Sequence, residues 1–241
     1  MRDLRVGLCG FTMAMADYPR HFRVVEVQQT FYDPPREATL ERWRTTLPPA
    51  FEFTLKAWQL ITHAATSSTY RRLKRPLDDR ARAQAGSFRR NATVEAAWRT
   101  TLRCARLLRA SAVLFQCPAS FRPTDENAEA MRRFFSAIGA SDGLRYLWEP
   151  RGLWPPALVA ALCGELGLTH VVDPFVTPTV TRGFTYYRLH GLSGARHVYD
   201  DRELAALDRM IPAEGTSYVM FNNLPRVGDA QRFIRTASPP G

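Results

Sequence analysis

Charged side chains lie in or at the ends of several short apolar segments of this chain. Glu26 lies within the run Val24–Val27, Lys56 ends the run that starts at Phe51, and Glu149 ends the run that starts at Leu144. A charged group in a buried strand costs several kcal/mol unless it is paired or hydrogen-bonded. Each of these residues is therefore either one half of a structural ion pair or part of a site for proton transfer and anion binding.

More polar residues follow the same kind of segment, and they suit a ligand site. The candidate catalytic residues are Glu149, Glu26, Asp173, His190 and Lys56. The candidate substrate-binding residues are Arg151, Arg188, Gln116, Asn222, Asn223, Tyr32 and His63. Arginine forks bind carboxylate or phosphate at two points, amides suit hydroxyl groups or a developing oxyanion, and histidine titrates near neutral pH. For His190, a simple hydrogen bond at the rim of the fold is the alternative.

The same set contains ligands that a divalent metal ion would accept. Carboxylate oxygens and an imidazole nitrogen are available at Glu26, Glu149, Asp173 and His190. The three cations of the set would crowd such a metal, and the chain has only five histidines. The sequence therefore predicts no cofactor and leaves a divalent metal as the weaker alternative.

The elements that must position these residues are eight short apolar segments, separated by helical patterns or long connections. The segments start at Leu4, Val24, Phe51, Ala112, Leu144, Thr169, Phe184 and Tyr218. This alternation predicts the α/β class and a single (β/α)8 TIM-type barrel over residues 1–236, followed by a disordered tail at 237–241. In such a barrel the strands end at one mouth, so we expect the polar residues to meet there.

Positive charge is concentrated in one stretch of the chain. Of a net charge of +10 over 241 residues, the segment 64–110 carries +9, from twelve cations and three acids. We interpret this segment as a basic helical insertion after the third strand. It would present an anion-binding surface for DNA or RNA through Arg71, Arg72, Arg75, Arg89 and Arg90. A solvated helix face in an arginine-rich protein is the alternative, because the chain has only two lysines.

Other features of the sequence concern the compartment. No apolar run approaches the roughly 18 residues of a membrane span, and the start Met1–Leu4 does not resemble a secretory signal. The four cysteines are scattered, without a CxxC pair. We therefore expect a reduced, cytoplasmic protein without membrane contact, disulfide frame or zinc knuckle. The sequence does not indicate an oligomeric state.

An ordered series of motifs resembles the YecE-like family, the domain of unknown function numbered 72. The motifs are Val25-Glu26-Val27, Thr30-Phe31-Tyr32, Lys56 with Thr62-His63, Phe115-Gln116-Cys117-Pro118, Glu149-Pro150-Arg151 with Trp154, Asp173, Arg188-Leu189-His190-Gly191 and Phe221-Asn222-Asn223. The likeness runs from about Leu4 to Ile234. It implies a TIM-type barrel with a functional mouth at these residues, and it implies no particular reaction.

Three functions are compatible with these residues. The first is a hydrolase-like enzyme for a phosphate-bearing substrate such as nucleic acid. In it Glu149 would be the general base, His190 or Asp173 would handle the second proton, and Glu26 would hold Lys56. The second is a hydrolase, lyase or isomerase of a sugar or carboxylate, for which paired carboxylates are also suited. The third is a non-catalytic nucleic-acid-binding module.

Overall fold

Eight parallel strands form a closed barrel in the order β1 to β8, so the predicted fold class is confirmed. The computed structural model describes residues 2–140 and 143–237. The predicted tail falls mostly on 238–241, outside the described residues, and Ala237 is the last residue of a helix. The strands are β1 Arg2–Cys9, β2 Val24–Val27, β3 Glu52–Lys56, β4 Ala112–Gln116, β5 Arg145–Glu149, β6 Leu168–Val172, β7 Phe184–Leu189 and β8 Gly215–Phe221.

The two faces of the strands bury different sets of side chains. Because strand side chains alternate with a period of two, Val24 and Leu114 belong to a small buried cluster in the lumen, whereas Val25 and Phe115 belong to the larger cluster under the helices. The lumen cluster comprises Cys9, Val24, Ala112, Leu114, Leu147, Val171, Phe184, Tyr186, Tyr218 and Met220. A lumen filled in this way is a packed core, and it forms the floor under the mouth.

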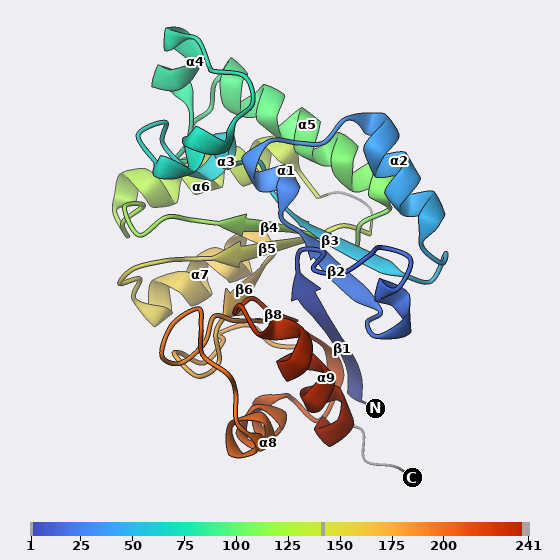
Figure 1. Cartoon of the computed structure of the whole chain (residues 1–241). Coiled ribbons are helices and arrows are strands. Elements are labelled where there is room, and N and C mark those ends of the chain that lie inside the picture. Colours follow the sequence, from blue (N-terminus) through green and yellow to red (C-terminus); the bar gives the residue numbers. More distant parts are fainter. Residues whose placement is uncertain (1, 141–142, 238–241) are drawn as a thin grey trace.

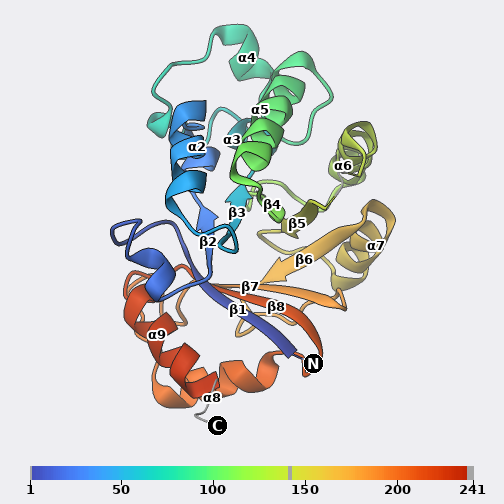
Figure 2. The same cartoon turned by 90° about the vertical axis from the view of Figure 1, so that its right-hand side faces the viewer.

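Helices surround the barrel (Figures 1 and 2). The α-helices are α1 Gln29–Tyr32, α2 Glu37–Thr46, α3 Gln59–Thr62, α4 Asp79–Gln84, α5 Ala92–Leu108, α6 Asp125–Ile138, α7 Pro156–Leu166, α8 Asp201–Met210 and α9 Arg226–Ala237. Short 3-10 helices span η1 Tyr18–Arg20 and η2 Ser68–Arg72. The chain passes from β6 to β7 through residues 173–183 without a helix.

Helix boundaries follow local capping chemistry. Thr124 is the N-cap of α6, because its hydroxyl accepts a hydrogen bond from the Asn127 backbone N–H at 3.2 Å. The Asn91 side chain caps α5 in the same way. Helix α7 ends at Gly167 with φ +64°, a left-handed conformation that favours glycine.

The expected basic helical insertion over 64–110 is not confirmed as a unit. Helix α5 connects β3 to β4 and packs against α2, so it is one of the barrel's own helices. The part outside the β/α repeat is 64–91, which we call the basic arm; it holds η2 and α4. Figure 1 shows α4 on the outer side of α5, on the far side of the molecule from α8 and α9.

No helix among the residues with described positions is long and apolar enough to cross a membrane.

Candidate functional site

A buried arginine joins two buried carboxylates at the centre of the mouth. Arg188, in β7, is 1% exposed, and Glu26, in β2, is fully buried. The Arg188 guanidinium donates to Glu26 through Nε at 3.0 Å and through Nη2 at 2.9 Å. Its Nη1 donates to Glu149 Oε2 at 2.5 Å. This two-point geometry offsets the loss of hydration that burying three charges requires.

Glu26 has further hydrogen-bond donors, and Lys56 is not among them. The Tyr186 hydroxyl donates to Glu26 Oε2 at 2.9 Å, and Gln28 Nε2 donates to Oε1. The expectation that Glu26 holds Lys56 was therefore wrong. Arg188 occupies the carboxylate because it projects from a strand across the lumen and its planar fork matches a carboxylate better than an ammonium does.

Lys56, the last residue of β3, lies at the mouth with little exposure. Its Nζ donates to Gln116 Oε1 at 2.7 Å and lies 3.8 Å from the centroid of the Phe31 ring. No carboxylate of the described residues lies within ion-pair distance of it. Burial lowers the pKa of Lys56 to about 7, and the nearby Arg188 charge adds to this shift.

Glu149 links the dry floor of the mouth to its exposed edge. Its Oε2 accepts from Gln116 Nε2 at 3.0 Å, and its Oε1 lies 2.8 Å from Arg151 Nη2. Burial alone would raise the pKa of the Glu149 carboxyl. Arg188, a hydrogen bond from His190 and Arg151 outweigh burial and hold this pKa well below its usual range. Glu149 therefore stays ionised, and a permanently ionised, paired carboxylate is a poor general base at neutral pH.

His190 lies at the exposed edge between a donor and an acceptor. Its Nε2 is 2.9 Å from Arg151 Nη2 and 3.2 Å from Glu149 Oε1. A neutral ring can accept from the guanidinium at Nε2, and a protonated ring can donate to the carboxylate. The other nitrogen, Nδ1, lies 3.1 Å from the side-chain amide of Asn222. Each protonation state therefore has a partner. His190 is 26% and Arg151 40% exposed.

The backbone after β7 orients His190. Asp173, which follows β6, accepts the His190 backbone N–H at 2.9 Å through Oδ2. Gly191 has φ +90°, and a Cβ there would collide with the Gly194 carbonyl. Asp173 therefore positions His190 through the main chain and is not itself part of the side-chain cluster.

Tyr32 and His63 lie on the side of the mouth where the basic arm docks. Arg72 lies over the Tyr32 ring, with 3.5 Å from the guanidinium carbon to the centroid. His63 is buried, bonds to the Thr62 hydroxyl through Nδ1 at 2.8 Å and packs against Phe31. Burial lowers the pKa of His63 to about 4, with a further effect from Lys56. The His63 ring is neutral and enclosed, so its role is to line one side of the mouth.

The other predicted residues have different positions. Asn223 is buried and turned toward Asp229 and the His197 carbonyl, at 2.5 and 2.9 Å, so it braces the loop after β8. Arg71 and Arg75 are exposed on the basic arm. Arg89 donates to the Ala83 carbonyl, and Arg90 lines a groove on the outside of the barrel.

The sequence interpretation missed four residues in contact with the core of the site. They are Cys9, Gln28, Thr54 and Tyr186, which hydrogen-bond to Arg188, to Glu26 or to one another. The sequence pattern could have identified two of them, Tyr186 and Thr54. Tyr186 and Thr54 lie two residues before Arg188 and Lys56 in their strands, and a period of two puts each pair on the same face.

Within the described ranges, no group of three or more His, Cys, Asp and Glu side chains could hold a metal ion. The Arg188 guanidinium takes the space between Glu26 and Glu149, where a cation shared by these carboxylates would lie.

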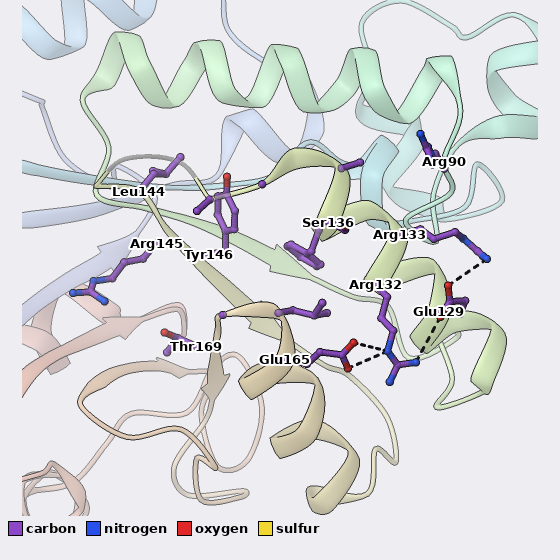
Figure 3. Close-up of a pocket in the computed structure, with 16 residues that line it drawn as sticks. Arg90, Glu129, Arg132, Arg133, Ser136, Leu144, Arg145, Tyr146, Glu165 and Thr169 are labelled. Atoms are coloured by element: carbon purple, nitrogen blue, oxygen red, sulfur yellow. Dashed lines mark hydrogen bonds and ion pairs between the residues drawn. The ribbon is translucent and has the colours of Figure 1, made fainter.

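A groove of about 920 Å³ lies between α6 and α7, at the other end of the barrel (Figure 3). Its charged groups are largely paired, because Arg132 bonds to Glu165 at 2.9 Å and Arg133 lies 3.7 Å from Glu129. Arg145 and Thr169, near the starts of β5 and β6, lie at its inner end. Barrel enzymes place their chemistry at the strands' carboxyl ends, so the mouth remains the candidate site.

The motifs of this mouth have counterparts in a known family. The model described as "Protein of unknown function DUF72" matches residues 11–238. The chain belongs to the DUF72 family. The resemblance drawn from the motifs is therefore confirmed. No functionally curated protein matches this DUF72 chain.

Solved structures of similar shape agree with the barrel. A DUF72 family protein from Enterococcus faecalis V583 gives a TM-score of 0.73 at 18% identity, over 98% of this chain and 97% of that one. A DUF72 family protein from Thermotoga maritima MSB8 gives a TM-score of 0.68 at 19% identity, and the match covers 97% of this chain and 98% of that one. D-psicose 3-epimerase, solved in the presence of D-fructose, gives a TM-score of 0.58 at 14% identity, and the match covers 98% of this chain and 97% of that one. At these identities the likeness establishes the fold alone.

Replacing Arg188 with methionine tests its role as the central brace. The change leaves Glu26 and Glu149 buried without their shared cation, so we expect a loss of about 3–5 kcal/mol in the free energy of unfolding. Arg132→Met is the matched control. It breaks an exposed pair with Glu165 and should cost under about 1 kcal/mol. Urea denaturation at neutral pH measures both. Equal losses in the two variants would contradict the brace.

Proposed function

We propose that this chain is an enzyme that uses general acid–base catalysis on an anionic substrate at the C-terminal mouth of the barrel. The substrate class is a small molecule that bears a phosphate or a carboxylate. The observation that carries the proposal is the position of His190 Nε2, within hydrogen-bond distance of both a guanidinium donor and a carboxylate acceptor. A proton-transfer group needs a partner in each of its protonation states, and these contacts provide one.

Each neighbour of His190 has a role in this proposal. His190 moves a proton at Nε2 to or from the substrate. Glu149, whose pKa is held well below its usual range, stays ionised and stabilises the imidazolium. Arg151, the most exposed cation of the cluster, binds the substrate anion. Arg188 has Glu26 and Glu149 as partners, so it is a positioning residue and not a substrate clamp.

Two kinds of proton transfer suit this arrangement. One is proton removal next to a carbonyl group, and a structure of similar fold is named as a sugar epimerase. The other is protonation of a leaving group or activation of water during hydrolysis of an ester, including a phosphate ester. Gln116, Asn222 and Tyr32 lie around the same mouth and suit contacts with hydroxyl groups of either kind of substrate.

The role of His190 is tested with a panel of sugar phosphates, sugar acids and phosphate esters, incubated in D₂O and followed by proton NMR. We expect conversion, or deuterium incorporation, for at least one member. His190→Gln should lower its rate constant by about 100-fold or more, the usual contribution of a general acid or base. Arg151→Gln should chiefly raise KM for that substrate. His197→Gln is the control, because His197 bonds to Glu203 on the same connection. Turnover in His190→Gln at the rate of the His197 variant would refute the proposal.

The basic arm favours nucleic acid as a second candidate for the anionic ligand. Arg71, Arg72, Lys74 and Arg75 are exposed. Arg72 and Lys74 contact Tyr32 and Asp33, next to the mouth. A row of exposed cations beside a mouth could follow a phosphate backbone and present part of it to the site.

Fluorescence anisotropy with labelled single- and double-stranded oligonucleotides across a salt series tests this candidate. If Arg71, Arg72 and Arg75 contact phosphates, changing all three to glutamate should lower the salt slope by about 2–3. The control changes three exposed arginines elsewhere, Arg20, Arg42 and Arg209, to glutamate. Absence of binding at low salt, or an equal effect of both triple variants, would exclude the arm as a nucleic-acid contact.

A further inference from the structure

Lys56 is a buried amine whose possible carboxylate partners are already engaged. Glu26 and Glu149 both bond to Arg188, and the Lys56 side chain retains a hydrogen bond to Gln116 and the face of Phe31. The residue is only 4% exposed. An ammonium group in this position would have three N–H bonds, one hydrogen-bond acceptor and no counter-ion at ion-pair distance among the described residues. Such surroundings favour the neutral amine.

The lone pair of that amine has no competing donor. The contact with Gln116 uses an N–H of Lys56, because Oε1 can only accept. No group of the described residues donates a hydrogen bond to Nζ. A neutral lysine with a free lone pair is a nucleophile toward carbonyl carbon, and burial next to another cation is a known way to produce one.

The cluster around Lys56 can also handle the protons of such a reaction. Gln116 connects the amine to Glu149, with Nε2 to Oε2 at 3.0 Å, and the other carboxylate oxygen lies 3.2 Å from His190 Nε2. Two residues, Gln116 and Glu149, therefore connect the nucleophile to the proton donor His190. Arg151 lies at the exposed edge, where a charged group of the same small molecule could bind.

We propose that Lys56 forms an imine with an aldehyde or ketone that also bears a phosphate or carboxylate group. The Nζ lone pair attacks the carbonyl carbon, and a proton moves from nitrogen to the former carbonyl oxygen, which gives a carbinolamine. Protonated His190 then gives its proton to the hydroxyl group. Water leaves with the C–O bond pair, and the nitrogen lone pair forms the C=N bond of a protonated imine. No oxidant or reductant is needed.

This inference rests on the proposed function, because the same mouth and the same Arg151 and His190 serve both. It adds the carbonyl group to the description of the substrate and a covalent role for Lys56. The negative charge of Glu149 acts on the Lys56 nitrogen beyond ion-pair distance, and it would stabilise the positive charge of the protonated imine.

The chain offers an internal control for a trapping experiment, since Lys56 and Lys74 are its only lysines. Lys74 is 83% exposed, so a reaction governed by access alone would modify Lys74. At pH 7 a lysine with a pKa of about 7 is half neutral, whereas at the ordinary value only about one in 3,000 is neutral.

The experiment incubates the full chain with glyceraldehyde 3-phosphate and sodium cyanoborohydride at pH 7, then maps the reduced adduct by digestion and mass spectrometry. We expect about tenfold more adduct on Lys56 than on Lys74, because more of the Lys56 amine is neutral. Uncharged glyceraldehyde, or the Arg151→Gln variant, should lower the Lys56 adduct and leave the Lys74 adduct unchanged. An adduct confined to Lys74 or the amino terminus would overturn the imine.

Calorimetry with glycerol 3-phosphate, which has the phosphate and lacks the carbonyl, separates this inference from the proposed function. Binding that weakens in Arg151→Gln, without an adduct on Lys56, would overturn the imine and leave the anion site standing. If glycerol 3-phosphate does not bind and Lys56 is not modified, the imine and the phosphate-binding role of Arg151 are both refuted.

Discussion

The contact between Arg188 and its two glutamates determines the chemistry of the whole mouth. One guanidinium neutralises Glu26 and Glu149 together, through a fork on the first and a single 2.5 Å bond to the second. This arrangement allows two carboxylates to stay charged in a packed lumen. It also uses up the groups that could have paired with Lys56. Lys56 is therefore buried with no counter-ion at ion-pair distance in the part of the chain that the structure describes, and burial lowers its pKa to about 7.

The mouth divides into a dry floor and a wet edge, and Glu149 belongs to both. On the floor, Glu149 contacts Arg188 and Gln116; at the edge, it contacts Arg151 and His190. The floor fixes positions and charges, because Arg188, Glu26 and Glu149 are packed and joined by hydrogen bonds. The edge is more exposed, since His190 is 26% and Arg151 40% exposed. The proposed active site needs both properties, and here they meet on a single carboxylate.

The sequence predicted the barrel and most residues of its mouth, because strand ends can be recognised from alternating apolar runs and TIM barrels bring those ends together. It did not predict the pairing. Which cation neutralises Glu26 depends on distances across the lumen, and Arg188 is 162 residues away in the chain. The sequence predicted that Asn222 and Asn223 both bind substrate. They follow each other directly after β8, so their side chains point in different directions, and Asn223 bonds to Asp229. The segment 64–110 was interpreted as one insertion because of its basic charge. Charge does not indicate which helix connects two strands of the barrel, and α5 connects β3 to β4.

The most direct test of this account is an NMR titration of the two lysines, labelled with ¹³C at Cε and assigned with the Lys74→Arg variant. The account predicts that Lys56 loses its proton as the pH rises through about 7. Below that pH the side chain is charged and carries the full penalty of burial. As the pH rises from about 7 toward the ordinary value of 10.5, the cost to stability falls, because the folded protein carries the neutral amine while the unfolded chain still has to give up its proton. A midpoint at or above the ordinary value of 10.5 would mean that Lys56 has a counter-ion in solution. That result would contradict the claim that Arg188 engages both glutamates and leaves Lys56 unpaired.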